Sequence, residues 1–414
     1  SNRSRSIIDP DGNESTIILN GEGNVLSIVN PLGERTTTLW DRNQKRAVID
    51  ALGNRTSYIY HQSATGARPL RATIDSLGNR STYLYDSQDR VAAKIDKRGY
   101  RTTLVWDGNG NRIGMINAEG YRSSYIYESS GEPAAYIDEL GNRTSYIYDS
   151  SGSTIAYIDP AGNRTTYAKN SAGQTIATID PLGQRTTYVK DLMNRLTATA
   201  NALGERTSYI YDLMGRREAT LSPMGSRTTL VYNSRNQLAA EISASGSRTS
   251  YVYDLRGHRI ATESPVGAIT TQVIDNAGRP VAVITPLGQR TTFTRDLAGR
   301  TVATINPMGQ ISTIVYSTTG NVRSRINPLM SITSYLYDSA GRQIAEIDAN
   351  SHRTSNIYNE VGRIAAIEDA GGQRTTFNYD PAGWPIGNIN PLGDRATTIF
   401  DSRGLPSATV DASG

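Results

Sequence analysis

The residues that most often carry catalysis are scarce in this chain of 414 residues. It holds three histidines, His61, His258 and His352, and no cysteine. General acid–base catalysis and zinc binding usually need histidines that a fold gathers with carboxylates or thiolates. These three fall at unrelated places of a repeating pattern. The sequence therefore predicts no catalytic centre, no metal site and no cofactor, and we expect that the protein is not an enzyme.

Two short motifs have a chemical alternative. The stretch DPDGNE, from Asp9 to Glu14, alternates oxygen-bearing side chains. A calcium loop of the EF-hand type needs glycine at its sixth place and a later glutamate, whereas Gly12 stands at the fourth. We interpret it as a turn, with an ion as the alternative. The Asn-Arg-Ser/Thr triplets match the glycosylation pattern; we interpret them as part of the repeat, with glycosylation as the alternative. They begin at Asn54, Asn79, Asn142 and Asn163.

Arginine forms a column with a constant spacing of 21 residues. Its clearest members are Arg143, Arg164, Arg185, Arg206, Arg227 and Arg248. A row of like charges could bind polyanions or acidic sugars. We favour pairing of each arginine with the aspartate that ends the preceding strand, such as Asp138, Asp159 or Asp180, since exposed pairs add under about 1 kcal/mol each but neutralise the row. The net charge is only +4, because acids are interleaved, and this argues against a nucleic-acid partner.

Tyrosine forms two further columns. They contain Tyr146, Tyr148, Tyr167, Tyr188, Tyr209, Tyr211, Tyr251 and Tyr253. Such rings could stack on sugars, which would make the protein a carbohydrate binder. We favour aromatic ladders along a sheet, where each pair adds about 0.5–1.5 kcal/mol beyond its burial.

A repeat of 21 residues must position all these side chains. Its markers are turn glycines such as Gly141, Gly162, Gly183, Gly204, Gly225, Gly246 and Gly288, with Met330 and Ser351 in the same place. We expect the glycines to have positive φ, and local distortion at the two substitutes. The repeat from Gly33 to Gly53 is one residue short, and we expect an irregularity near Asp41 to Lys45. We interpret residues 1–414 as a single repeat array, cut from a longer one.

Each repeat reads as two short strands and two turns. Alternating β-branched and aromatic residues predict the strands, and the Asp-x-x-Gly and Asp-Pro-x-Gly segments predict the turns. The fold class is therefore all-β, a continuous antiparallel meander of about 40 strands. Open sheets rarely exceed about ten strands without curling, because their twist accumulates. We expect the meander to coil into a tube, a spiral wall or a fibre.

The odd repeat length adds a constraint. Side chains alternate faces along a strand, so two identical turns would put successive repeats on opposite faces. One step in each repeat must break this parity, by a different loop length or by a bulge. We favour different loops, which would place Tyr146 opposite Ala156, Thr144 opposite Ile158, and Asp159 opposite Arg164. Each alanine of the series Ala156, Ala177, Ala198 and Ala219 would then lie between two tyrosine rings.

The recurring YD..GR motif resembles the YD-repeat, or Rhs-repeat, family. The matches are Tyr148-Asp149, Tyr211 to Arg216, Tyr253-Asp254 and Tyr337 to Arg342. The resemblance implies a strip of β-hairpins that spirals into a hollow shell, in large secreted or surface proteins, some of which enclose a toxin. The self-cleaving core and the toxin of such proteins have no counterpart here. The segment DPAGW, from Asp380 to Trp384, is only vaguely similar to the cleavage motif and lies in register as an ordinary turn.

Identical repeats leave no unique site, so function must come from shape, length and surface. We expect a non-catalytic structural protein, a fibre or tubular wall, located outside the cell or on its surface. The alternatives are the encapsulating shell of a polymorphic toxin and a carbohydrate-binding adhesin. The expected partners are neighbouring repeats or chains, with carbohydrate as an alternative. No nucleic acid and no membrane insertion are expected.

Overall fold

The computed structural model describes residues 2–9, 12–62 and 66–411. These ranges contain 39 strands and no helix, in one antiparallel sheet that is not closed. Each strand pairs with the next one in sequence, as β14 does with β15 and β15 with β16. The predicted all-β meander is confirmed, and its strand number is close to the expected one.

The strands in chain order are β1 (Arg3–Ile8), β2 (Glu14–Leu19), β3 (Val25–Val29), β4 (Arg35–Asp41), β5 (Gln44–Ile49), β6 (Arg55–Tyr60), β7 (Leu70–Ile74), β8 (Arg80–Tyr85), β9 (Val91–Ile95), β10 (Arg101–Trp106), β11 (Arg112–Ile116), β12 (Arg122–Tyr127), β13 (Pro133–Ile137), β14 (Arg143–Tyr148), β15 (Thr154–Ile158), β16 (Arg164–Lys169), β17 (Thr175–Ile179), β18 (Arg185–Lys190), β19 (Leu196–Ala200) and β20 (Arg206–Tyr211). They continue with β21 (Arg217–Leu221), β22 (Arg227–Tyr232), β23 (Leu238–Ile242), β24 (Arg248–Tyr253), β25 (Arg259–Glu263), β26 (Ile269–Ile274), β27 (Pro280–Ile284), β28 (Arg290–Arg295), β29 (Thr301–Ile305), β30 (Ile311–Tyr316), β31 (Val322–Ile326), β32 (Ile332–Tyr337), β33 (Gln343–Ile347), β34 (Arg353–Tyr358), β35 (Ile364–Glu368), β36 (Arg374–Tyr379), β37 (Pro385–Ile389), β38 (Arg395–Phe400) and β39 (Pro406–Val410).

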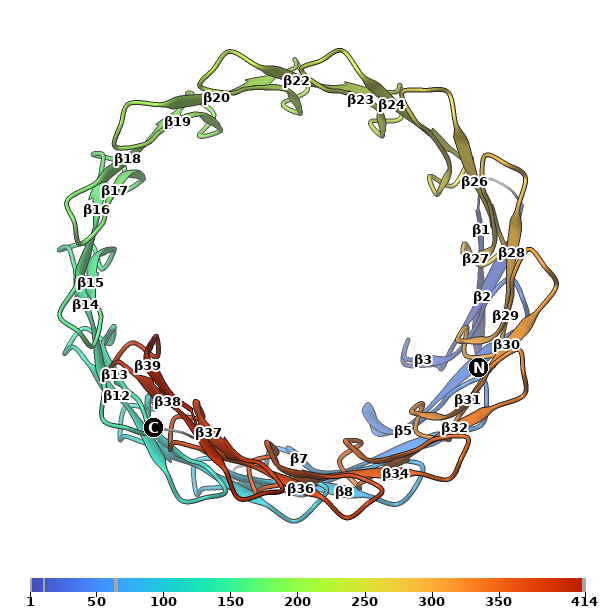
Figure 1. Ribbon diagram of the computed structural model, residues 1–414, viewed down its shortest axis with the longest axis horizontal. Coiled ribbons are helices and arrows are strands. Elements are labelled where there is room, and N and C mark those ends of the chain that lie inside the picture. The colour runs from blue at the N-terminus through green and yellow to red at the C-terminus, as the bar shows by residue number, and fades with distance from the viewer. Residues whose placement is uncertain (1, 10–11, 63–65, 412–414) are drawn as a thin grey trace.

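The sheet coils into a spiral around a central opening, and the last third of the chain passes alongside the first third (Figure 1). Ser76 reaches Thr318, 242 residues further on, and Glu34 reaches Arg279, 245 residues further on. One coil therefore takes about eleven and a half repeats of 21 residues. Of the three expected shapes, the chain adopts the spiral wall.

Both turns of a repeat have the same backbone closure. In residues 149–153, Asp149 N donates to Ser153 O and Gly152 N donates to Asp149 O, both at 3.0 Å. In residues 159–163, Asp159 N donates to Asn163 O and Gly162 N to Asp159 O, also at 3.0 Å. We call these two loop types the YD turn and the DP turn. Our expectation that the two loops differ in length is therefore wrong.

A bulge breaks the parity instead. In the β14–β15 pair, Ile147 lies opposite Ala156 but Tyr148 lies opposite Thr154, so Ile155 is an extra residue. The same register shift occurs in the pairs β16–β17 and β20–β21. One extra residue in each repeat lets the side chains keep their faces over an odd period.

The bulge also corrects the predicted register. Tyr146 lies opposite Tyr157 and not Ala156. Arg164 lies opposite Ile158 and not Asp159, and Ile158 lies opposite Ser145 on its other side. Thr144 pairs with Tyr136 of the preceding strand and not with Ile158. The predictions failed because they placed the extra residue of each repeat in a turn. In the structure it lies inside the odd-numbered strand.

The core of the wall is a column of alanines one side chain thick. Ala47, Ala72, Ala93, Ala135, Ala156, Ala177, Ala198, Ala219, Ala240, Ala282, Ala345 and Ala366 are completely buried. Gly114 stands in this column and shows what covers it. A Cβ placed on Gly114 would lie 3.2 Å from Nε of Arg122 and 3.3 Å from the carbonyl oxygen of Ser123. The column is therefore closed by the next strand and by its first arginine.

The irregular repeats behave differently from one another. In the short repeat, Asp41 pairs with Gln44 across a two-residue loop whose Arg42 and Asn43 both have positive φ. This is the irregularity expected near Asp41 to Lys45. Met330 and Ser351 have φ of 63° and 68° and close their turns with the usual hydrogen bonds, of 3.0 Å each. Our expectation of distortion there is wrong, because the backbone keeps the left-handed conformation despite the side chain.

Candidate functional site

An aspartate or asparagine at the first place caps most of the described turns in the same way, and a serine or threonine hydroxyl does so in a few. In the YD turn of residues 212–216, Oδ1 of Asp212 accepts from the backbone N–H groups of Met214 and Arg216, each at 2.9 Å. In the DP turn of residues 138–142, Oδ1 of Asp138 accepts from Leu140 N at 2.9 Å and Asn142 N at 2.8 Å. Short aspartate side chains favour such turns because they replace backbone hydrogen bonds.

The final arginine of YD..GR links one repeat to the next. Arg216 donates from Nε to Oδ2 of its own Asp212 at 2.8 Å, and its guanidinium lies 4.4 Å from the ring centre of Tyr232 in the following repeat. Arg300 and Arg342 cover Tyr316 and Tyr358 at 4.3 and 4.0 Å. A guanidinium over an aromatic ring is attracted by its π-face, by about 0.5–1 kcal/mol at exposed sites.

The tyrosine of the same motif links backwards to the preceding repeat. The hydroxyl of Tyr211 donates to the carbonyl oxygen of Leu196 at 2.8 Å, and Tyr253 makes the same bond to Leu238. Leu196 begins β19, which pairs with β20 only through its last three residues. The tyrosine therefore supplies a hydrogen bond where consecutive hairpins splay apart. In β4 the indole Nε1 of Trp40 does so for Val25 O, at 2.8 Å.

Replacing Tyr211 with phenylalanine should lower stability by about 0.5–1.5 kcal/mol, because the Leu196 carbonyl loses its donor while the ring stays under Arg195. Hydrogen exchange across β19 and β20 should speed up, and chemical denaturation measures the loss. Tyr209→Phe is the matched control, since no hydrogen bond of the Tyr209 hydroxyl is found among the described residues. Equal effects of the two changes would contradict the assignment.

The arginine column does not form the predicted pairs. Asp138 and Asp159 use their second carboxylate oxygens to accept from Asn142 and Asn163, at 3.0 and 2.9 Å. Arg143 donates from Nε to the hydroxyl of Ser145 at 3.0 Å, as Arg206, Arg227 and Arg248 do to the Ser or Thr two residues on. The prediction failed because each aspartate is already engaged in its own turn. All six arginines of the column are exposed at the strand start.

The tyrosines lie in two different surroundings. Tyr148, Tyr211 and Tyr253 donate to the preceding repeat. The other five tyrosines stand five residues after the glycine of the DP turn. Each lies opposite the fourth residue of the next strand, such as Tyr157 or Thr178. They are Tyr146, Tyr167, Tyr188, Tyr209 and Tyr251. In the described part of the chain, ring–ring pairs occur elsewhere, for example between Tyr125 and Tyr136 at 5.1 Å.

The other candidates are turn residues. His258 and His352 each place Nδ1 at 3.1 Å from the aspartate of their own turn, and the His61 ring lies 5.5 Å from that of Tyr85. No group of three or more potential metal-binding side chains occurs in residues 2–9, 12–62 and 66–411. Two residues of DPDGNE, at 10 and 11, lie outside the described residues. The glycosylation candidates Asn54, Asn79, Asn142 and Asn163 donate their side-chain amides to turn aspartates.

A seam joins the two coils where they overlap. There, the DP turns of the first coil face the YD turns of the second. Arg363 lies 3.7 Å from Glu119, and Arg256 lies 3.7 Å from Asp9. Arg98 donates to Asn359 O at 3.4 Å, and Ser76 donates to Thr318 O at 3.2 Å. The seam therefore joins the turns of opposite rims, through side chains that meet either side chains or backbone carbonyls. We call these rims the DP rim and the YD rim.

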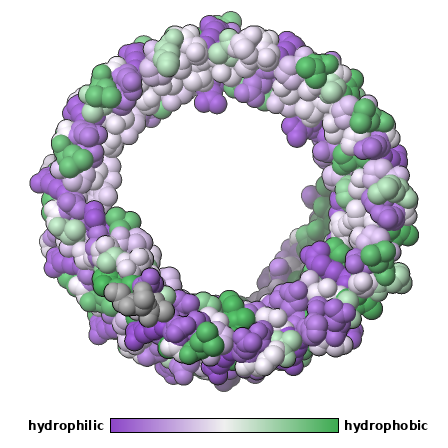
Figure 2. Space-filling model, in the orientation of Figure 1, coloured by the Kyte–Doolittle hydropathy of each residue, from purple (hydrophilic) through white to green (hydrophobic). Residues whose placement is uncertain are grey.

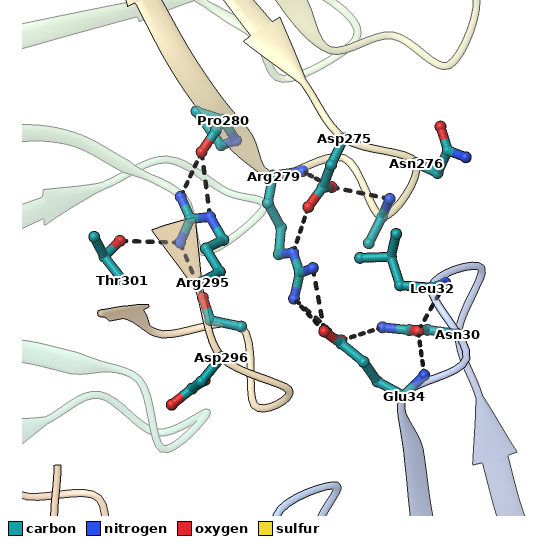
Figure 3. Close-up of polar contacts among 12 residues, drawn as sticks. Asn30, Leu32, Glu34, Asp275, Asn276, Arg279, Pro280, Arg295, Asp296 and Thr301 are labelled. Atoms are coloured by element: carbon teal, nitrogen blue, oxygen red, sulfur yellow. Dashed lines mark hydrogen bonds and ion pairs between the residues drawn. The ribbon is translucent and has the colours of Figure 1, made fainter. Parts of the chain in front are cut away.

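The best-formed seam contact centres on Arg279 (Figure 3). Its Nε donates to Asp275 at 2.9 Å, and its Nη1 lies 3.1 Å from Glu34 of the other coil. Asn30 donates to the same Glu34 carboxylate at 2.6 Å. Burial opposes the charge of Arg279, but the Asp275 and Glu34 carboxylates outweigh it and raise the pKa of the guanidinium. The closure of the turn and the seam thus share one side chain.

Acid should weaken the array. Partial burial of the Asp275, Asp296 and Asp338 carboxyls raises their pKa, but hydrogen bonds from the turn backbone and the turn arginine outweigh it and hold each pKa below the usual 3.8. A pKa that folding lowers stabilises the fold above the usual value, and the gain is lost as pH falls through the folded value. The thermal midpoint should therefore be constant above about pH 5 and fall below about pH 4. A midpoint that stays level or rises down to about pH 2.5 would refute this.

Sequence reasoning missed two groups of residues. The first is the arginine that ends YD..GR. Its constant sequence spacing from the tyrosine and the aspartate could have indicated its contacts with the turn and with the next repeat. The second is the apolar residue at the third place of the DP turn, such as Leu32 or Leu182. It looked like an ordinary exposed side chain, because the sequence does not show which turns another coil covers.

Comparisons with known proteins agree with this geometry. The family described as RHS Repeat matches residues 275–311 and 358–395. A crystal structure of TcdB2-TccC3 has a TM-score of 0.70 at 13% identity, over 96% of this chain and 29% of that one. TcdB2-TccC3-Cdc42 gives 0.67 at 15%, over 99% and 24%. A Tc holotoxin pore from Photorhabdus luminescens gives 0.57 at 13%, over 97% and 28%. No curated protein matches.

The fold and its linked turns define a coiled wall of β-hairpins. The chain contains RHS repeats at residues 275–311 and 358–395, as the YD..GR motif predicted. It spans less than a third of the length of the solved chains that it resembles. At these identities the similarity to the solved structures is one of fold. No helix long and apolar enough to cross a membrane occurs among the described residues.

Proposed function

We propose that this chain is a non-catalytic structural protein, one section of a coiled wall that encloses a lumen outside the producing cell. The observation that carries the proposal is the seam. A wall that only coiled would leave a slit between its coils, whereas here Arg279, Arg363 and Arg98 bridge them. The fold likeness to TcdB2-TccC3 supports the encapsulating form of this function.

The repeat couplings support the same proposal mechanically. Each YD..GR unit makes one contact forwards, through Arg216 to Tyr232, and one backwards, through Tyr211 to Leu196. Contacts between neighbouring repeats produce a quasi-one-dimensional array, in which each interface adds to the stability of the whole. The carbohydrate-binding alternative has less support, because the rings of Tyr211 and Tyr232 lie under guanidinium groups.

Electron cryo-microscopy of the purified chain tests the proposal. We expect rings with an open centre whose two ends overlap. The double variant Arg279→Ala, Arg363→Ala should open the overlap while the circular dichroism of the sheet stays unchanged. The matched control is Arg195→Ala, Arg216→Ala, which removes two turn arginines outside the overlap. Filled particles or uncoiled ribbons would contradict the proposal.

A further inference from the structure

Most of both rims lies outside the overlap. The DP turns from residues 30–34 to 159–163 face the second coil. Among the described residues, no contact with another coil is found for the DP turns from 180–184 to 390–394. Similarly, the YD turns from 254–258 onwards are covered, and those up to 233–237 are not. We call the uncovered parts the open DP rim and the open YD rim. They belong to opposite edges of the wall.

The exposed fraction of the apolar side chain at the third place of the DP turn differs between the covered and the open parts of the rim. Where another coil covers the rim, Leu32, Leu52, Leu77 and Leu140 are 38–62% exposed. On the open DP rim, Leu182, Leu203, Met224, Val266, Leu287, Met308, Leu329 and Leu392 are 79–88% exposed. The same residue type at the same place of the repeat thus loses exposure only in the seam. Figure 2 shows apolar patches at intervals around the ring.

The opposite rim shows the same contrast. On the open YD rim, Leu192 and Leu213 are 106% and 107% exposed. Leu255 and Leu297 occupy the same place of the turn in the overlap and are 55% and 56% exposed. Both halves of the seam therefore continue, uncovered, beyond the overlap.

The charges of the seam also continue onto the open rims. Asn201 donates to Glu205 at 2.7 Å, just as Asn30 holds Glu34 at 2.6 Å. The Glu34 side chain is only 10% exposed because it meets Arg279, whereas Glu205 is exposed. On the open YD rim, Arg195 and Arg216 are held by their turn aspartates as Arg279 is. Each open rim thus carries one half of the Arg279–Glu34 contact.

We propose that the open DP rim of one molecule binds the open YD rim of a second copy of this chain, so that the coils stack into a tube. This inference rests on the proposed wall function and extends it. A second copy fits because it offers the YD rim that the chain itself places on its own DP rim. Each seam contact found here involves at least one side chain and none is a strand pairing, so stacking does not require the sheet to continue between molecules. Contacts between two different surfaces produce open-ended assemblies unless the rotation between copies closes a ring, and stacking along the coil axis closes none.

Two variants that each destroy one rim test the proposal. The DP-rim variant carries Leu182→Glu, Leu203→Glu and Leu287→Glu, and the YD-rim variant carries Leu192→Glu and Leu213→Glu. These leucines are free in the isolated chain, so both variants should fold. Lys94→Glu with Lys190→Glu is the control, because both lysines are exposed on strands.

Sedimentation velocity between about 1 and 100 μM should show stacks of increasing length for the unaltered chain and for the lysine control. Each rim variant alone should remain a single coil, with association at least about tenfold weaker. An equimolar mixture of the two should form discrete dimers, because one intact DP rim then meets one intact YD rim.

Three results would overturn the proposal: an unaltered chain that stays a single coil, rim variants that stack as well as the unaltered chain, or a mixture without dimers. Single hollow rings in the microscope would then leave the wall function standing. Filled or uncoiled particles would remove both proposals, so the two failures can be told apart.

Discussion

Replacing Ala177 with leucine should lower the free energy of unfolding by about 1–3 kcal/mol, the usual cost of overpacking a dense core. Ala177 is completely buried in the alanine column and lies opposite Ala168 on one side and Thr187 on the other. The counterpart Gly114 shows that even a Cβ there lies 3.2 Å from the next arginine. A leucine must therefore displace that arginine or spread the strands. Denaturant unfolding followed by circular dichroism measures the loss.

Ala168→Ile is the matched control for this change. Ala168 faces Ala177 but is partly exposed, and the corresponding places in other repeats hold Ile147 and Ile210. The added volume should be tolerated there, with a change below about 0.5 kcal/mol. If both variants lose the same stability, then the alanine column is not a special constraint on volume.

Replacing Gly183 with valine should cost about 1–2 kcal/mol, because its φ is 79° and an L residue is strained in that region. Nothing lies within 4 Å of a Cβ at this place, so the expected cost is conformational and not steric. The other predicted turn glycines, Gly141, Gly162, Gly204, Gly225, Gly246 and Gly288, also have positive φ. Thermal unfolding of the variant measures the effect.

Gly183→Asn is the matched control, because asparagine tolerates the left-handed conformation and already occupies it at Asn194 and Asn236. The asparagine variant should be clearly more stable than the valine variant. Equal stabilities would mean that the turn avoids the strain by changing its backbone, which would contradict the rigid closure seen at Met330 and Ser351.

The local structure could be predicted from the sequence because the same pattern of strand and turn residues recurs in about twenty repeats. The turn glycines, the short strands and the irregularity at Arg42–Asn43 all follow from composition and spacing. The register could not, because Ile155 in the bulge looks like any other strand residue. The odd repeat length requires either two unequal loops or a bulge in each repeat. Both arrangements are compatible with the same order of residue types, so the sequence does not distinguish them.

The seam was beyond prediction for a different reason. Glu34 and Arg279 are 245 residues apart, and only the curvature of the whole sheet decides that they meet. That curvature is the sum of small rotations in every hairpin, and a single-sequence argument gives no value for it. For the same reason, Glu205 and Glu34 look equivalent in the sequence, although only Glu34 is covered by the other coil.

The strand count of a coil has a geometric consequence. Glu34 ends the turn after β3, and Arg279 ends the turn after β26, 23 strands further on. Because 23 is odd, a loop of one edge meets a loop of the other edge tip to tip, whereas an even count would set loops against gaps. A wider or narrower coil keeps this match only if it gains or loses a whole hairpin, which is about 9.6 Å of circumference. The inner diameter of such a wall can therefore change only in discrete steps, each of which adds or removes one whole hairpin per coil.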